Sequence, residues 1–167
     1  MKRLFAVFAC ALAFGAPTSA LAQFTGDQDL THGWELRLGG FVAEKKASRN
    51  KGGDLWLAIG AERAFYETEN LRTTLSIDYY GAQNIYSVPL CFNVRSTNAD
   101  GLHVGAGVGL SLGHDIDSGM SALAYNLLLG YMTSAGTNPI TVDLRYLGTN
   151  ASHQELNGWS LTVGYRF

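Results

Sequence analysis

The feature that most constrains this chain is a strict two-residue alternation in which both faces have a distinctive composition. In the final stretch, "NGWSLTVGYRF", large apolar residues occupy every second position up to Phe167. Between them lie glycine, hydroxyl residues and Arg166. Successive side chains of a β-strand point to opposite faces, so this pattern predicts a strand with one apolar face and one face of small and polar residues.

The same alternation recurs along the chain and predicts eight strands. Most of them are about 10 residues long, which is enough to cross a bilayer when tilted. No helical periodicity is found after the N-terminal segment, and we expect no helix there. The predicted strands are Gly33–Ala43, Asp54–Tyr66, Arg72–Gly81, Asn84–Arg95, Gly101–Leu112, Met120–Thr133, Pro139–Leu147 and Gly158–Phe167.

The strands of a soluble β-sandwich also alternate between apolar and polar residues, so the composition of the polar face must distinguish a membrane barrel from a sandwich. Here that face carries glycine, serine and alanine with isolated charges, and no lysine occurs after Lys51. In "GAGVG" (Gly105 to Gly109) the glycines lie on this face, and no helix follows as a nucleotide-binding loop would require. Small residues suit the narrow interior of an eight-stranded barrel, and only a closed barrel satisfies all backbone groups in lipid. We therefore predict an all-β, transmembrane, up-and-down antiparallel β-barrel of eight strands.

Charged residues at inward positions predict a cross-linked interior. Acids and bases balance there, and buried charges are tolerable only when they are paired and hydrogen-bonded. This balance favours a filled polar interior over an open channel. Arg63 is assigned to the outer surface, with the alternative that a bulge turns it inward. The predicted interior polar network is Glu35, Arg37, Glu62, Asp78, Arg95, His103, Asp143, Arg145 and Arg166.

Outward aromatic residues are expected to form two belts, because amphipathic rings prefer the headgroup level of a membrane. One belt lies at the end where the barrel begins and ends, which we assign to the periplasmic side. Its members are Trp34, Phe65, Phe92, Tyr131, Tyr165 and Phe167. The opposite belt consists of Tyr79, Tyr86, Tyr146 and Trp159.

The first 22 residues have the pattern of a cleaved secretory signal peptide. Lys2 and Arg3 precede the apolar run "LFAVFACALAFG", and Ala20-Leu21-Ala22 provides a small-x-small cleavage site. Residues 23–32 would then form an N-terminal periplasmic segment, and residues 33–167 the barrel. The exported chain keeps Cys91 alone, so no intramolecular disulfide is expected. A net charge of -2 gives no indication of a nucleic-acid partner.

Two of the predicted loops contain residues with binding chemistry. The segment "EKKASRNKGGD", Glu44 to Asp54, carries three lysines and an arginine. It suits either pairing with lipopolysaccharide phosphates or an ordinary solvated loop. A second loop groups His114, Asp115 and Asp117, but three potential ligands in a loop are too weak a pattern to predict a metal site.

The export signal, the eight amphipathic strands and the terminal "GYRF" together resemble the small eight-stranded outer-membrane barrels of Gram-negative bacteria. In that family a terminal aromatic residue in the last strand is recognised by the barrel assembly machinery, and Tyr165 and Phe167 match this signal. The resemblance implies an outer-membrane location, a monomer, and contact with outer-membrane lipids and lipopolysaccharide. Such barrels include membrane-stabilising proteins, adhesion or immune-evasion proteins, and enzymes that modify lipid A.

The segment "YLGTNASHQELNG" resembles part of the lipid A 3-O-deacylases around its Asn150-Ala151 pair. That family carries His-x-Ser just before Asn-Ala, whereas Leu147 and Thr149 occupy those positions here. A nucleophile requires a base within hydrogen-bond reach, and leucine cannot supply one. The last strand contains no acid, and no His/Ser pair suited to acyl transfer lies near the outer rim. We therefore predict a non-enzymatic barrel with a structural or surface-interaction role and no cofactor. A lipid A-modifying enzyme and a narrow pore remain alternatives.

Overall fold

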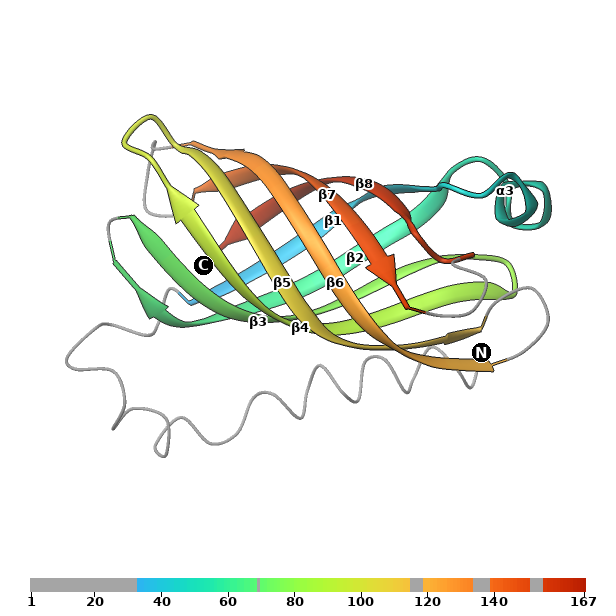
Figure 1. Ribbon diagram of the computed structural model, residues 1–167. Helices are drawn as coiled ribbons and strands as arrows, with labels where there is room; N and C mark the ends of the chain where they lie inside the picture. Colours follow the sequence, from blue (N-terminus) through green and yellow to red (C-terminus); the bar gives the residue numbers. More distant parts are fainter. Residues whose placement is uncertain (1–32, 69, 115–118, 134–138, 151–154) are drawn as a thin grey trace.

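The computed structural model describes residues 33–68, 70–114, 119–133, 139–150 and 155–167, and it confirms the predicted fold class. Each strand pairs antiparallel with its neighbour in sequence, and β8 pairs with β1 to close the barrel (Figure 1). Every predicted strand is present, with ends within two residues of those expected. The strands are β1 (Trp34–Ala43), β2 (Trp56–Glu67), β3 (Leu71–Ala82), β4 (Ile85–Thr97), β5 (Leu102–His114), β6 (Gly119–Met132), β7 (Ile140–Thr149) and β8 (Gly158–Arg166).

The barrel has two different ends, which we call the terminal end and the α3 end (Figure 1). At the terminal end β1 begins and β8 finishes, and the closing seam extends to the last residue of the chain. There the Trp34 amide donates to the Phe167 carbonyl at 3.2 Å, and the Phe167 amide donates to the Trp34 carbonyl at 3.0 Å. The opposite end carries the connection between β1 and β2. Phe167 therefore takes part in closing the barrel.

That connection contains a short helix, α3 (Lys46–Gly52), and the expectation of no helix in this region is wrong. Seven residues are too few to produce a detectable period, and the helix depends on contacts with the barrel rim. Arg49 Nη1 donates to the carbonyls of Ala43 and Glu44, each at 2.6 Å. Ser48 Oγ donates to the Glu155 carbonyl at 2.6 Å. In the part of the chain that the structure describes, no helix is long and apolar enough to cross a membrane.

A β-bulge near the end of β2 settles the position of Arg63. The register with β3 shifts between Ala64 and Tyr66, so the extra residue follows Arg63. Arg63 therefore keeps the outward assignment, and its Cζ lies 5.3 Å from the centroid of the Trp34 ring.

The outer surface of the barrel is apolar on all of its strands. Outward side chains remain well exposed, for example Leu38 at 60%, Val108 at 67% and Leu161 at 59%. Inward positions alternate with them and are buried along each strand. A water-soluble sheet would place the apolar face inward, so this barrel has the reverse distribution.

Candidate functional site

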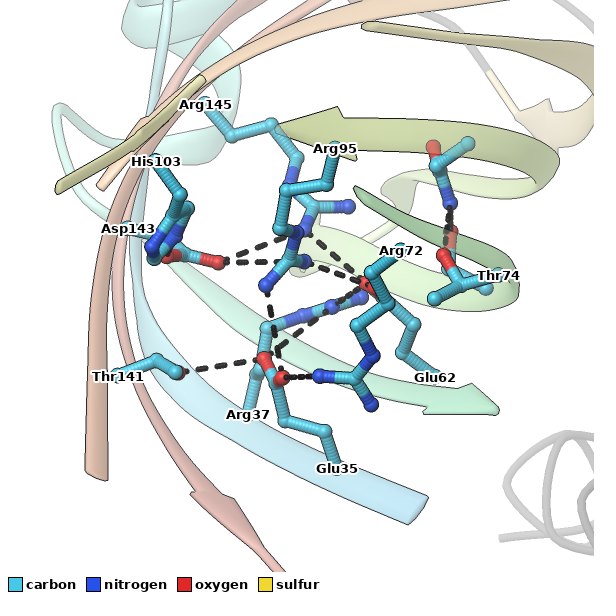
Figure 2. A network of polar contacts seen from close by, with 12 residues as sticks. Glu35, Arg37, Glu62, Arg72, Thr74, Arg95, His103, Thr141, Asp143 and Arg145 are labelled. Atoms are coloured by element: carbon cyan, nitrogen blue, oxygen red, sulfur yellow. Dashed lines mark hydrogen bonds and ion pairs between the residues drawn. The ribbon is translucent and has the colours of Figure 1, made fainter. Parts of the chain in front are cut away.

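A network of charged side chains occupies the half of the interior nearer the terminal end (Figure 2). Its members come from β1, β2, β3, β4 and β7, at positions whose side chains alternate inward. Each is at most 5% exposed, and four carboxylates face four guanidinium groups. The eight residues are Glu35, Arg37, Glu62, Arg72, Asp78, Arg95, Asp143 and Arg145.

Glu62 is the centre of this network and contacts three arginines. Arg37 donates to its Oε2, Arg95 donates to Oε1 at 2.8 Å, and Arg145 donates to Oε2 at 3.3 Å. These arginines come from β1, β4 and β7, so one carboxylate links strands from different sides of the barrel. A carboxylate that is inaccessible to solvent needs such charge-assisted bonds to offset its lost hydration.

Glu35 and Asp78 extend the network on either side of Arg37. Glu35 accepts hydrogen bonds from Arg72 at 3.1 Å and from the Thr141 hydroxyl at 3.2 Å. Asp78 accepts from Arg37 at 2.7 Å and lies 3.5 Å from Arg145 Nη1. Each carboxylate thus contacts more than one cationic or polar partner, and the charges neutralise one another within the barrel.

His103 and Asp143 form a buried pair beside the arginines. His103 Nε2 lies 2.7 Å from Asp143 Oδ1, and Asp143 Oδ2 lies 3.7 Å from Arg95 and 3.6 Å from Arg145. Gly130 makes room for the pair, since a Cβ at this position would meet both Asp143 Oδ1 and His103 Nε2. His103 is only 2% exposed. A histidine so enclosed has no access to an external substrate.

The structure places eight of the nine predicted interior residues inside the barrel and Arg166 at its terminal mouth. Arg166 pairs with Glu67, and its side chain is 13% exposed. Sequence reasoning missed Glu67 and the buried Arg72. Arg72 could have been predicted from the sequence, because it lies an even number of residues from Asp78 on β3 and therefore faces the same way, into the barrel.

Neutral polar groups fill the interior between β3 and β6. Asn126 Nδ2 donates to Asn93 Oδ1 at 2.8 Å, and Asn93 Nδ2 donates to Ser76 Oγ at 3.0 Å. The hydroxyls of Ser87 and Ser111 lie 2.7 Å apart. These short side chains bond to one another between strands on one side of the barrel. Gly107 on β5 leaves space for them, since a Cβ there would meet both Asn93 Oδ1 and Asn126 Nδ2.

A cluster of large apolar side chains fills much of the interior near the α3 end, which corrects the prediction of a polar filling. Phe41 lies at the centre of the cluster, with ring centroids 5.5 Å from Trp56 and 4.8 Å from Tyr80. Leu156, from the connection between β7 and β8, adds to it and is 1% exposed. The largest members of this apolar plug are Phe41, Trp56, Tyr80, Ile85, Leu147 and Leu156.

The residues aligned with the deacylase motif have structural contacts in this barrel. Leu147 is buried in the apolar plug. The Thr149 hydroxyl donates to Asn157 Oδ1 at 2.9 Å, and the Thr149 amide donates to the same oxygen at 2.8 Å. Asn150 Oδ1 accepts from the Leu123 amide at 2.9 Å. Ala151 and His153 lie outside the described residues.

The outward aromatic residues gather mainly as expected. At the α3 end the ring of Tyr146 lies 5.0 Å from Trp159, and Tyr79 stacks on Tyr86 at 6.2 Å. At the terminal end Tyr165 stacks on Phe167 at 6.2 Å, and Trp34 and Tyr131 also lie on the outer surface. Phe65 is the extra residue of the β2 bulge and is half-buried. Phe92 does not lie at the terminal rim, because its register partners on the neighbouring strands, Leu75 and Val108, lie well inside β3 and β5. Tyr66 and Tyr125 are further exposed rings that the prediction missed.

The loop residues considered for binding are only partly described. His114 ends β5 and its ring lies 6.4 Å from that of Tyr86, while Asp115 and Asp117 lie outside the described residues. Within the described ranges, no group of three potential metal ligands is found. The cations of the basic segment lie on α3 and immediately before it, where Lys45, Lys46 and Lys51 are exposed.

Taken together, a closed eight-stranded barrel, an apolar outer surface and a charged interior define the fold of the small outer-membrane β-barrels. Two solved structures have similar architecture. Neisserial surface protein A matches with a TM-score of 0.54 and 14% identity over 80% of this chain and 94% of that one. The outer membrane protein Ail of Yersinia pestis matches with a TM-score of 0.46 and 12% identity over 81% and 99%. No protein-family model and no curated protein sequence matches the chain.

Proposed function

We propose that this protein is an outer-membrane barrel that acts through its surfaces, by strengthening the membrane or displaying its loops, and not through a pore or a reaction. The observation that carries the proposal is the filled interior. Glu35, Glu62 and Asp143 have no solvent-accessible surface although they lie inside the barrel. A continuous water channel would wet such charges, and the apolar plug covers them toward the α3 end.

Membrane insertion is supported by the outer surface. Apolar side chains face outward on all eight strands, and burying them in lipid gains about 25 cal/mol for each Å² removed from water. Every strand has two partners in the closed sheet, so no open sheet edge would be exposed in the hydrocarbon region. We place the terminal end at the periplasm and the α3 end outside the cell, with cleavage of the signal peptide before Gln23.

Lipid A mass spectrometry tests the absence of a reaction. Lipid A from cells that make the protein should have the same acyl chains as lipid A from cells that lack it. The deletion strain should instead become more sensitive to detergents and large antibiotics, because its membrane loses a stiff component. The gain or loss of one acyl chain on lipid A would overturn the proposal in favour of a lipid A-modifying enzyme.

The lysines around α3 are proposed to contact lipopolysaccharide phosphates at the outer surface. Lys45 and Lys46 lie at the start of the helix, where the helix dipole disfavours cations and no acid is present. Replacing Lys45, Lys46 and Lys51 with glutamine should weaken binding to lipopolysaccharide vesicles, and replacement with arginine should preserve it. Equal binding by both triple variants would exclude this contact.

The terminal aromatic pair is proposed as the signal for the barrel assembly machinery, and the barrel is proposed to be monomeric. Tyr165 and Phe167 stack at the end of the closing strand. The variant Phe167→Ala should accumulate unfolded in the periplasm, whereas Phe92→Ala should assemble normally. Normal assembly of both variants would contradict a role for the terminal ring.

A further inference from the structure

Three buried polar atoms inside the barrel make no hydrogen bond to any residue that the structure describes. They are Asp143 Oδ2, Arg145 Nη1 and Thr162 Oγ1. Asp143 has no exposed surface, Arg145 is 2% exposed and Thr162 is 5% exposed, so bulk solvent does not satisfy these atoms. Buried polar atoms of folded proteins nearly always have a hydrogen-bond partner, which raises the question of what the partner is here.

The three atoms belong to neighbouring positions on the inward face of the sheet. Asp143 on β7 and Thr162 on β8 are register partners, and Arg145 lies two residues after Asp143 on the same strand. Residues two apart on a strand point to the same face, and all three positions are buried in the alternation of their strands. The register partner of Thr162 on its other side is Gly39 of β1, which has no side chain to offer the hydroxyl.

Ion pairing balances the charges of Asp143 and Arg145 but leaves these atoms without hydrogen bonds. Asp143 Oδ2 lies 3.7 Å from Arg95 Nη2 and 3.6 Å from Arg145 Nη2 (Figure 2). Arg145 Nη1 lies 3.5 Å from Asp78 Oδ2. Direct N–H···O hydrogen bonds are about 2.7–3.2 Å long, so all three contacts are too long for one. Polar contacts of this length are typical places for a bridging water molecule.

The chemistry of this position requires a neutral group that both donates and accepts hydrogen bonds. Asp143 Oδ2 can only accept, Arg145 Nη1 can only donate, and the Thr162 hydroxyl can do either. The guanidinium groups of Arg95 and Arg145 would repel a cation, and the carboxylate of Asp143 would repel an anion. Water fits all three atoms, and buried waters in proteins make about three hydrogen bonds to polar groups of this kind.

We propose that one water molecule is bound inside the barrel between Asp143, Arg145 and Thr162, as a fixed part of its interior. The water donates to Asp143 Oδ2, accepts from Arg145 Nη1 and shares a hydrogen bond with Thr162 Oγ1. It thereby connects the charged network on β7 to β8, and Thr162 positions it. The site requires only the folded barrel, so it goes beyond the proposed function and does not depend on it.

A crystal structure of the folded barrel, at a resolution that shows ordered waters, tests the site. The wild type should show one density peak at hydrogen-bond distance from both Asp143 Oδ2 and Thr162 Oγ1. Thr162→Val keeps the shape of the side chain but removes the hydroxyl and should lose the peak, whereas Thr162→Ser should keep it. Thr141→Val is the matched control, since the Thr141 hydroxyl is equally buried but bonds to Glu35, and its loss should leave the water in place.

Oxygen-17 relaxation dispersion provides a second measurement in detergent micelles, because it counts the waters that a protein holds for long times. Thr162→Val should hold one long-lived water fewer than the wild type, and Thr141→Val and Thr162→Ser should hold the same number as the wild type. Each variant is first checked for heat-modifiable migration, which reports a folded barrel.

Four results would overturn the site. The first is a wild type without the density peak, and the second is a direct hydrogen bond from Thr162 Oγ1 to Asp143 or to a backbone carbonyl. The third is an anomalous peak at this position in crystals soaked with rubidium bromide, which would assign it to an ion. The fourth is a folded Thr162→Val variant that keeps the water at full occupancy, which would remove Thr162 from the site.

Discussion

Glu62 shows at the residue scale how this barrel keeps charges in its interior. One carboxylate receives hydrogen bonds from Arg37, Arg95 and Arg145, and none of its surface reaches solvent. Removing one member of such a group leaves the others buried without compensation, which costs more than the intact network contributes. The interior therefore depends on the complete set of charges.

The variant Glu62→Gln tests this dependence. It should lower the free energy of unfolding by about 3–5 kcal/mol, because three arginines lose their shared counter-charge. Urea unfolding in lipid vesicles, followed by tryptophan fluorescence, measures the change. Asp54→Asn is the control, since its side chain is 94% exposed and its pairing with Arg49 is weak. Equal stability of the two variants would be inconsistent with a buried network.

Gly130 provides a second test at the residue scale. A Cβ there would meet both partners of the His103–Asp143 pair, so Gly130→Ala should destabilise the barrel by about 1–3 kcal/mol. Among the residues that the structure describes, a Cβ at Gly119 would approach only the Gly113 carbonyl, at 3.8 Å, and Gly119→Ala should therefore have little effect. The same unfolding assay compares them. A neutral Gly130→Ala would mean that the pair is not so tightly enclosed.

At the scale of elements, the strands were predictable because their signal is local. Alternation fixes which residues face inward, and a register error of one residue would reverse every side chain. The same parity places Phe41, Trp56 and Tyr80 inward, so the apolar plug could have been predicted from the sequence. The small and charged residues that share the inward face with these rings predicted a polar interior, which holds only for the half nearer the terminal end.

Helix α3 and the position of Leu156 could not be predicted in this way. The helix is held by Arg49 and Ser48 through bonds to carbonyls of β1 and of the connection between β7 and β8. Leu156 belongs to no strand and enters the plug from that same connection. The contacts of Ser48 and Leu156 join segments that are far apart in sequence. An alternating pattern along one strand gives no information about such contacts.

The plug is tested by Leu156→Ala. Truncating this fully buried side chain should cost about 2–5 kcal/mol through lost burial and the cavity that remains. Leu55→Ala is the control, because Leu55 is 70% exposed near the same rim. Thermal unfolding in micelles distinguishes the two variants. If Leu156→Ala unfolds with the same midpoint as the wild type, Leu156 does not stabilise the plug.

At the scale of the whole molecule, the barrel combines an apolar exterior with an interior that the described residues fill with buried charges and an apolar cluster. Four acids and four arginines neutralise one another in the half nearer the terminal end, and the apolar plug lies toward the α3 end. The charged network and the apolar plug obstruct the passage of ions independently, because the network consists of paired charges and the plug of packed apolar side chains. Loosening the plug alone should therefore leave the barrel closed to ions.

Planar-bilayer conductance tests the central claim of a sealed barrel most directly. Purified protein, shown by heat-modifiable migration to be folded, is inserted into bilayers and the current is recorded under an applied voltage. We predict no discrete current steps from the wild type, and none from Leu156→Ala, because the network around Glu62 remains in place. Reproducible steps of uniform size from the folded wild type would contradict the sealed interior and favour a narrow pore.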